Sequence, residues 1–142
     1  MRKVFTATLV FAGLSFSLFC VSLVDSKASN AAAALFSPTQ AKRGESVYSK
    51  RCVGCHGQDL NGGEHAPPLV GDAFLANWDG KQSRPFYARI ISTMPADDPG
   101  VVPAPEVLEL VAYIFSQNGI PLGDTDAKTS NDMNGVVIKS PN

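Results

Sequence analysis

Cys52-Val53-Gly54-Cys55-His56 is the stretch of sequence that decides how this chain folds. Its C-x-x-C-H spacing is the attachment signature of haem c. Two thiols at this spacing can add to the two vinyl groups of one haem, and the adjacent histidine can then bind the iron from one side. The stretch therefore predicts one covalently bound haem c, held by Cys52, Cys55 and His56.

Two other interpretations compete for the cysteine pair. A redox-active C-x-x-C pair of the thioredoxin type normally belongs to a framework of strands and helices, and this sequence shows no convincing alternating strand pattern. A structural zinc site needs further Cys or His ligands at characteristic spacing, and only His65 lies nearby in the sequence. Both patterns fit the chain less well than haem attachment does.

The N-terminus has the pattern of an export signal. Arg2 and Lys3 precede an uncharged stretch over residues 4–24, and small residues within 28–34 offer cleavage sites. As a helix the uncharged stretch would be about 31 Å long, enough to cross a bilayer, so residues 1–31 are either a cleaved signal or an uncleaved membrane anchor. Both alternatives place the rest of the chain in the periplasm or another extracytoplasmic space. This location favours haem attachment as the role of the two cysteines, because c-type haem is attached outside the cytoplasm.

Composition excludes some partners. The chain has 12 Lys plus Arg against 13 Asp plus Glu and no basic block, so no nucleic acid is expected as a partner. From residue 32 on, nine basic and twelve acidic side chains remain, which hints at partners with basic surfaces. The third cysteine, Cys20, lies in the leader after Phe19, where a lipid-attached protein would have a small residue. Cys20 is therefore interpreted as an ordinary leader residue.

Three helices are predicted after the leader. The first is capped by Ser37, with Gln40 reaching back as in a capping box, and runs to about residue 50. Gly44 lies on its apolar stripe, which favours close packing against a strongly apolar helix over residues 105–118. A shorter helix is predicted over residues 83–93.

Two segments lack a helical pattern. Residues 57–80 are rich in Gly, Pro, Asn and Asp and are predicted to form an irregular loop. Residues 123–142 are polar and turn-forming, and they are expected to form a mobile or surface-wrapping tail without regular structure. The predicted domain thus spans residues 32–122. Its helices supply too little apolar surface for a core of their own, so the haem is expected to complete it.

Residues from about 41 to 123 resemble a class I monohaem cytochrome c. The resemblance rests on C-H-G-Q-D-L-N-G-G at 55–63, A-P-P-L-V-G at 66–71 and T-M-P-A-D-D-P-G at 93–100. In detail these stretches are most similar to small cytochromes and cytochrome domains associated with bacterial dehydrogenases. The resemblance implies an all-α cytochrome c fold, with three to four main helices around one haem c and with crossing N- and C-terminal helices.

The resemblance also implies the second axial ligand of the iron. Met94, followed by Pro95, matches the position of the family's methionine, whose thioether binds the iron opposite the histidine. The other candidates are Met133, in the polar tail, and His65, which is expected to be exposed in a Gly- and Pro-rich loop. Met94 is the predicted ligand.

Other contacts are implied less specifically. A carbonyl group of Pro67 or Pro68 is expected to accept a hydrogen bond from the non-ligating nitrogen of His56, which would fix the ring and its basicity. For three further residues two explanations are equally good: a contact with the haem edge or its propionates, or a role in packing or at the surface. These are Trp78, Tyr87 and Arg89.

An iron bound by His56 and Met94 has no open site for a substrate or for oxygen, so the resemblance implies single-electron transfer rather than catalysis. The expected role is an extracytoplasmic carrier between a dehydrogenase and a terminal oxidase or another cytochrome. One alternative is a dedicated haem c subunit of a dehydrogenase complex, with the tail as a docking segment. Another is a haem enzyme or gas sensor in which Met94 dissociates. Contact with a membrane is expected only through the N-terminal segment.

Overall fold

The computed structural model describes residues 35–141. This part of the chain contains five α-helices and one short 3-10 helix. In chain order they are α1 (Pro38–Arg51), α2 (Val53–His56), α3 (Gly71–Trp78), α4 (Ser83–Thr93), α5 (Ala104–Gln117) and η1 (Ser130–Met133). These residues form no strand, which confirms the predicted all-α class. None of the described helices is long and apolar enough to span a membrane. The predicted leader and Cys20 lie outside the described residues.

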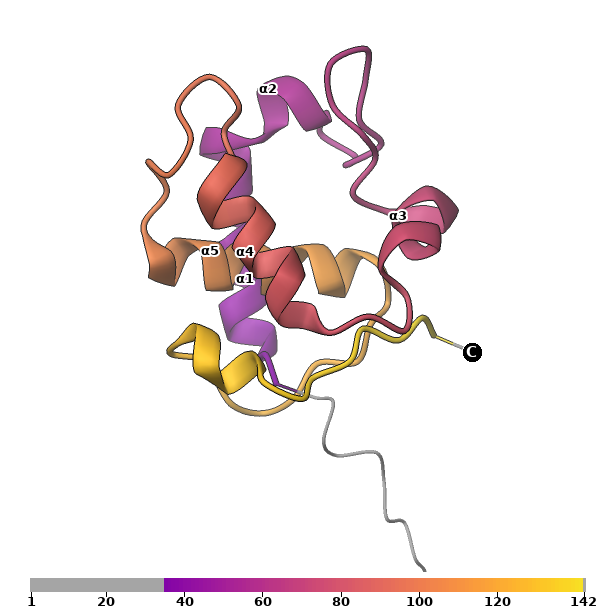
Figure 1. The fold of residues 1–142 in the computed structure, drawn as a ribbon, viewed down its shortest axis with the longest axis vertical. Coiled ribbons are helices and arrows are strands. Elements are labelled where there is room, and N and C mark those ends of the chain that lie inside the picture. The colour runs from indigo at the N-terminus through magenta and orange to yellow at the C-terminus, as the bar shows by residue number, and fades with distance from the viewer. Residues whose placement is uncertain (1–34, 142) are drawn as a thin grey trace, which may run out of the picture.

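Helices α1 and α5 cross and pack closely, as Figure 1 shows. Gly44 lies at the crossing, where a Cβ atom built on it would lie 1.8 Å from the carbonyl oxygen of Glu109. Any larger residue would therefore push the two helices apart. The predicted crossing of the N- and C-terminal helices at this glycine is confirmed, and α1, α4 and α5 match the predicted helices within one residue at each end.

The start of α1 carries half of the predicted capping box. The Ser37 hydroxyl accepts a hydrogen bond from the Gln40 backbone N–H at 3.0 Å. The reciprocal half is wrong, because the Gln40 side chain turns away from Ser37 toward the C-terminal part of the chain. Its amide donates to the carbonyl of Ala127 at 2.8 Å and accepts from the N–H of Ala127 at 2.9 Å. A buried long-range contact thus replaces a local one.

Helix α3 corrects the prediction of an irregular loop over residues 57–80. Phe74 is only 1% exposed and packs edge-to-face against Phe86, with ring centroids 5.4 Å apart. A two-turn helix has little stability of its own, so this packing is what holds it. The Gly- and Pro-rich composition describes the segments on either side of α3 rather than the helix itself.

The C-terminal residues wrap around the domain instead of forming a mobile end. Residues 123–141, called the strap from here on, run from the start of α1 past the start of α4 to the turn between α3 and α4 (Figure 1). Met133 and Ile138 have no exposed surface. Met133 thus lies in a polar segment but is itself buried, because a few apolar side chains anchor this segment to the core.

Candidate functional site

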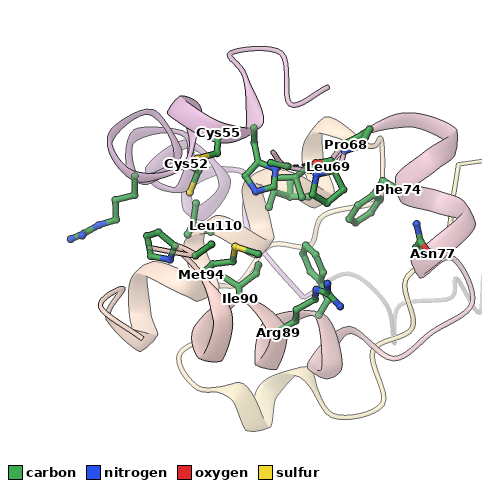
Figure 2. A pocket seen from close by; sticks show the side chains of 18 of the residues that line it. Cys52, Cys55, Pro68, Leu69, Phe74, Asn77, Arg89, Ile90, Met94 and Leu110 are labelled. Atoms are coloured by element: carbon green, nitrogen blue, oxygen red, sulfur yellow. Dashed lines mark hydrogen bonds between the residues drawn. The ribbon is translucent and has the colours of Figure 1, made fainter. Parts of the chain in front are cut away.

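A cavity of about 440 Å³ lies among helices α2, α3, α4 and α5 (Figure 2). Its volume is within the range of roughly 300–1,000 Å³ that is typical of small-molecule and cofactor sites. Much of its lining is apolar and comes from every side of the space. The apolar lining includes Leu69, Phe74, Phe86, Ile90, Leu110 and Ile114. Such a cavity suits a large apolar group with a few polar attachment points.

Cys52 and Cys55 lie together on one wall of this cavity (Figure 2). Cys52 ends α1, and the backbone N–H groups of Cys55 and His56 donate to its carbonyl oxygen at 3.2 and 3.0 Å. This tight turn brings the two thiols to the same edge, with Cys52 half-buried and Cys55 exposed. Both thiols are free, so both are available for thioether bonds to one group in the cavity.

The two competing interpretations of the cysteine pair do not fit this environment. Burial raises the pKa of Cys52 to about 11, and Arg51 opposes this rise only in part. A redox-active cysteine needs a lowered pKa, because the thiolate is the reactive form. A structural zinc site also lacks support, since residues 35–141 contain no cluster of three or more His, Cys, Asp or Glu that could hold a metal ion.

His56 has a fixed orientation in the cavity wall. The residue is 8% exposed, and its Nδ1 lies 3.0 Å from the carbonyl oxygen of Pro67. A carbonyl can only accept, so Nδ1 carries the proton and Nε2 keeps a free lone pair that can bind iron. Of the two proline carbonyls expected from the sequence, Pro67 makes the contact and Pro68 only lines the cavity.

The loop that carries Pro67 is held against His56 by a glycine. Gly62 has a φ of 74° and donates its N–H to the carbonyl of His56 at 2.9 Å. A Cβ atom on Gly62 would lie 2.4 Å from the carbonyl oxygen of Ala66. Only glycine satisfies both the backbone conformation and this close approach.

Met94 enters the cavity from the other side. It ends α4, where its N–H donates to the carbonyl of Ile90 at 3.0 Å, and Figure 2 shows it across the cavity from Cys55 and Pro68. The cavity is thus lined by both an imidazole and a thioether, the two groups predicted as axial ligands. Met133 is buried beneath α4 outside the lining, and His65 lies exposed at the rim.

The charged side chains that line the cavity are all basic. Arg51 pairs with Glu106 at 2.9 Å, whereas Lys81 and Arg89 form no ion pair within residues 35–141. Figure 2 shows Arg89 on the side of the cavity away from the two cysteines. Lys81 and Arg89 are both exposed, so their charged groups are free to pair with carboxylates of a bound group.

Two of the three residues whose role was open, Trp78 and Arg89, do line the cavity. Tyr87 is buried in the core outside the lining, so packing explains it. Lys81, which was not predicted as a site residue, also lines the cavity, and its ammonium nitrogen lies 5.7 Å from the centroid of the Trp78 ring. No local sequence signal marks Lys81, because contacts with the distant strap place it.

Comparisons with known proteins agree with this arrangement. The family model described as cytochrome C oxidase, cbb3-type, subunit III, matches residues 39–114. The chain is also similar to a chain in the crystal structure of the sulfane dehydrogenase SoxCD from Paracoccus pantotrophus, with 18% sequence identity and a TM-score of 0.50 over 87% of this chain and 68% of that chain. At this identity the likeness concerns the fold alone. No curated protein matches.

Proposed function

Since the chain belongs to the family of c-type cytochrome domains described as cytochrome C oxidase, cbb3-type, subunit III, we propose that it carries single electrons on one covalently bound haem c whose iron is bound by His56 and Met94. The observation that supports this most is the convergence of two thiols, an imidazole and a thioether on one apolar cavity, all within the matched residues. These side chains belong to Cys52, Cys55, His56 and Met94.

The haem, when bound, supplies a one-electron iron couple, and the residues around it set the potential of that couple. The hydrogen bond from His56 to the carbonyl of Pro67 fixes the imidazole and makes its free nitrogen a better ligand. The soft thioether of Met94 favours the ferrous state, and the apolar lining disfavours the extra ferric charge. We therefore expect a positive reduction potential.

The basic side of the cavity would hold the carboxylates of the haem. Lys81 and Arg89 are the two cations in the lining without an acidic partner among the described residues, and haem carries two propionates. Pairing would neutralise the charges of the two cations and the two propionates beside an apolar lining. Arg51 is already neutralised by Glu106, which leaves it out of this role.

The partners that fit this proposal are redox proteins: an extracytoplasmic dehydrogenase as donor and a terminal oxidase or another cytochrome as acceptor. The export pattern of residues 1–31 supports an extracytoplasmic location. The alternative is a dedicated haem c subunit of a dehydrogenase complex, for which the tail was considered as a docking segment. The strap is bound to its own domain, so it offers no free arm.

The test is to produce the full chain in cells that mature c-type cytochromes, then to stain a denaturing gel for haem and assay the pyridine haemochrome. One haem per chain that survives denaturation is expected. The oxidised protein should show the weak long-wavelength band of iron bound by methionine. A chain without covalent haem would refute the proposal, and carbon monoxide binding to the reduced protein would favour the gas-sensor alternative.

A further inference from the structure

The strap is attached to the domain at two places, the first of which is the start of α1. The side chain of Gln40 pairs with both backbone groups of Ala127, and the N–H of Gly123 donates to the carbonyl of Phe36 at 2.8 Å. Asp126 adds an ion pair with Arg43 at 2.7 Å. This attachment is remote from the cavity, because none of these residues lines it.

The second attachment is the turn between α3 and α4. Val137 forms an antiparallel bridge with Gln82. The next residue, Ile138, forms two backbone hydrogen bonds with the turn. The N–H of Ile138 donates to the carbonyl of Lys81 at 2.8 Å, and its carbonyl accepts from the N–H of Gly80 at 2.8 Å. The N–H of Gly80, just before Lys81, and the carbonyl of Lys81 itself are thus both bonded to one residue of the strap.

This second attachment is shielded from water. Ile138 and Ser83 have no exposed surface, and the N–H of Ser83 donates to the carbonyl of Val136 at 2.8 Å. The Ser83 hydroxyl also donates to the carbonyl of Met133 at 3.3 Å. Breaking these bonds would leave buried polar groups without partners, so the strap and the turn are held together firmly.

The turn that the strap holds forms one wall of the cavity. Trp78 and Lys81 both line it, and the N–H of Lys81 donates to the carbonyl of Trp78 at 3.1 Å. The Trp78 ring packs edge-to-face on Phe86 with centroids 4.8 Å apart, and the Lys81 ammonium lies over the Trp78 ring, 5.7 Å from its centroid. Lys81 therefore connects the strap, through its backbone, with the cavity, through its side chain.

We propose that the strap, acting through Ile138, positions the wall formed by Trp78 and Lys81 and thereby raises the reduction potential of the haem. This inference rests on the proposed function and concerns a segment outside the family match, which ends at residue 114. A cation held beside the haem and a wall that excludes water both disfavour the ferric charge. Without the strap the turn would move outward, water would enter, and the potential would fall.

The test is the variant Ile138→Pro in the full-length haem-loaded protein, because proline lacks the N–H that bonds to Lys81. Its midpoint potential is expected to fall below that of the wild type. Trp78 is the single tryptophan of the chain, so its fluorescence reports on the wall. The haem quenches it by energy transfer, and an outward movement of the wall should increase the emission severalfold.

The matched control is Gln40→Ala, which breaks the first attachment. It should lower the melting temperature but leave the potential and the Trp78 fluorescence unchanged. In a Lys81→Gln background, where the cation is already absent, Ile138→Pro should shift the potential less than it does in the wild type. If the proline variant does not fold, a chain that ends after Asn134 replaces it, since this truncation keeps η1 and the buried Met133.

Unchanged potential and fluorescence in a haem-loaded strap variant would overturn the inference, because the strap would then only stabilise the fold. An equal shift in the Gln40→Ala control would overturn it as well. Both results leave the proposed function intact. A wild-type chain without covalent haem would instead refute the proposed function, together with the inference that rests on it.

Discussion

At the crossing of α1 and α5 the protein fills its interior with its own atoms, whereas among α2, α3, α4 and α5 it surrounds a cavity of about 440 Å³. The crossing depends on the close approach of two backbones at Gly44. The cavity depends on side chains from separate segments that all face one space. The stability of the first region is therefore set by packing, and that of the second by what the cavity holds.

The largest expected effect comes from removing both thiols, which tests whether the crossing can sustain the fold alone. We expect the double variant Cys52→Ala/Cys55→Ala to yield little stable holoprotein, because the cavity would lose the covalent attachment of its occupant. Haem-stained denaturing gels and circular dichroism of the purified variant measure this. A well-folded, haem-free product would show that the crossing is sufficient.

A substitution at the crossing should come next. Gly44→Ala places a Cβ atom where the carbonyl oxygen of Glu109 lies only 1.8 Å away, so α1 and α5 must separate. The expected loss in the free energy of unfolding is about 3 kcal/mol, at the upper end for overpacking. Denaturant titration of the holoprotein measures it.

The control for this prediction is Gly63→Ala. A Cβ atom on Gly63 would lie 3.8 Å from the nearest atom, the carbonyl oxygen of Cys55, which is an ordinary contact. The expected change is about 0.5 kcal/mol or less. Equal losses in the two variants would contradict the view that close backbone approach at Gly44 determines the strength of the crossing.

A change inside the cavity should separate ligation from packing. Met94→Leu keeps the volume of the side chain, so the loss of packing free energy should be below about 1.5 kcal/mol. The long-wavelength band of the oxidised protein should disappear, the potential should fall, and the reduced iron should bind carbon monoxide. Visible spectroscopy and a redox titration check this, and persistence of the band would assign the ligand to another residue.

The smallest effect concerns the first attachment of the strap and depends on pH. The Ser37 hydroxyl and then the Arg43 guanidinium lower the pKa of Asp126 below its usual value. The ionised carboxylate therefore stabilises the fold above the unfolded-state pKa of about 3.9, and this contribution is lost as the pH falls through the lower folded-state pKa.

Asp126→Asn should therefore cost about 0.5 kcal/mol near neutral pH, a small value because the ion pair is partly exposed. Melting temperatures of the two proteins, measured from pH 7 down to about pH 2, should converge as the pH decreases. A constant difference across this range would exclude ionisation of Asp126 as the cause.

Sequence reasoning succeeded where the relevant interactions are local. The apolar stripes of α1, α4 and α5 and the small residue Gly44 were sufficient to predict three helices and their crossing, since each pattern lies within one helix. The C-x-x-C-H spacing named both thiols and His56, the family resemblance added Met94, and the structure brings all of them to one cavity.

The errors have a common physical cause, which is contact between segments far apart in the sequence. Helix α3 exists because Phe74 meets Phe86, the Gln40 side chain pairs with Ala127 instead of capping α1, and Met133 is buried under α4. Lys81 belongs to the cavity because Ile138 holds its backbone. None of these contacts leaves a periodic pattern in the sequence.

The bridge between Gln82 and Val137 also has a consequence for the order of assembly. The strap follows the C-x-x-C-H motif in the chain, so the motif is synthesised first. The hydrogen bonds that tie the Trp78 and Lys81 wall to Ile138 can form only after the strap has been synthesised. Under the proposed function, haem attachment at the two thiols can therefore precede the last contacts of the strap with this wall.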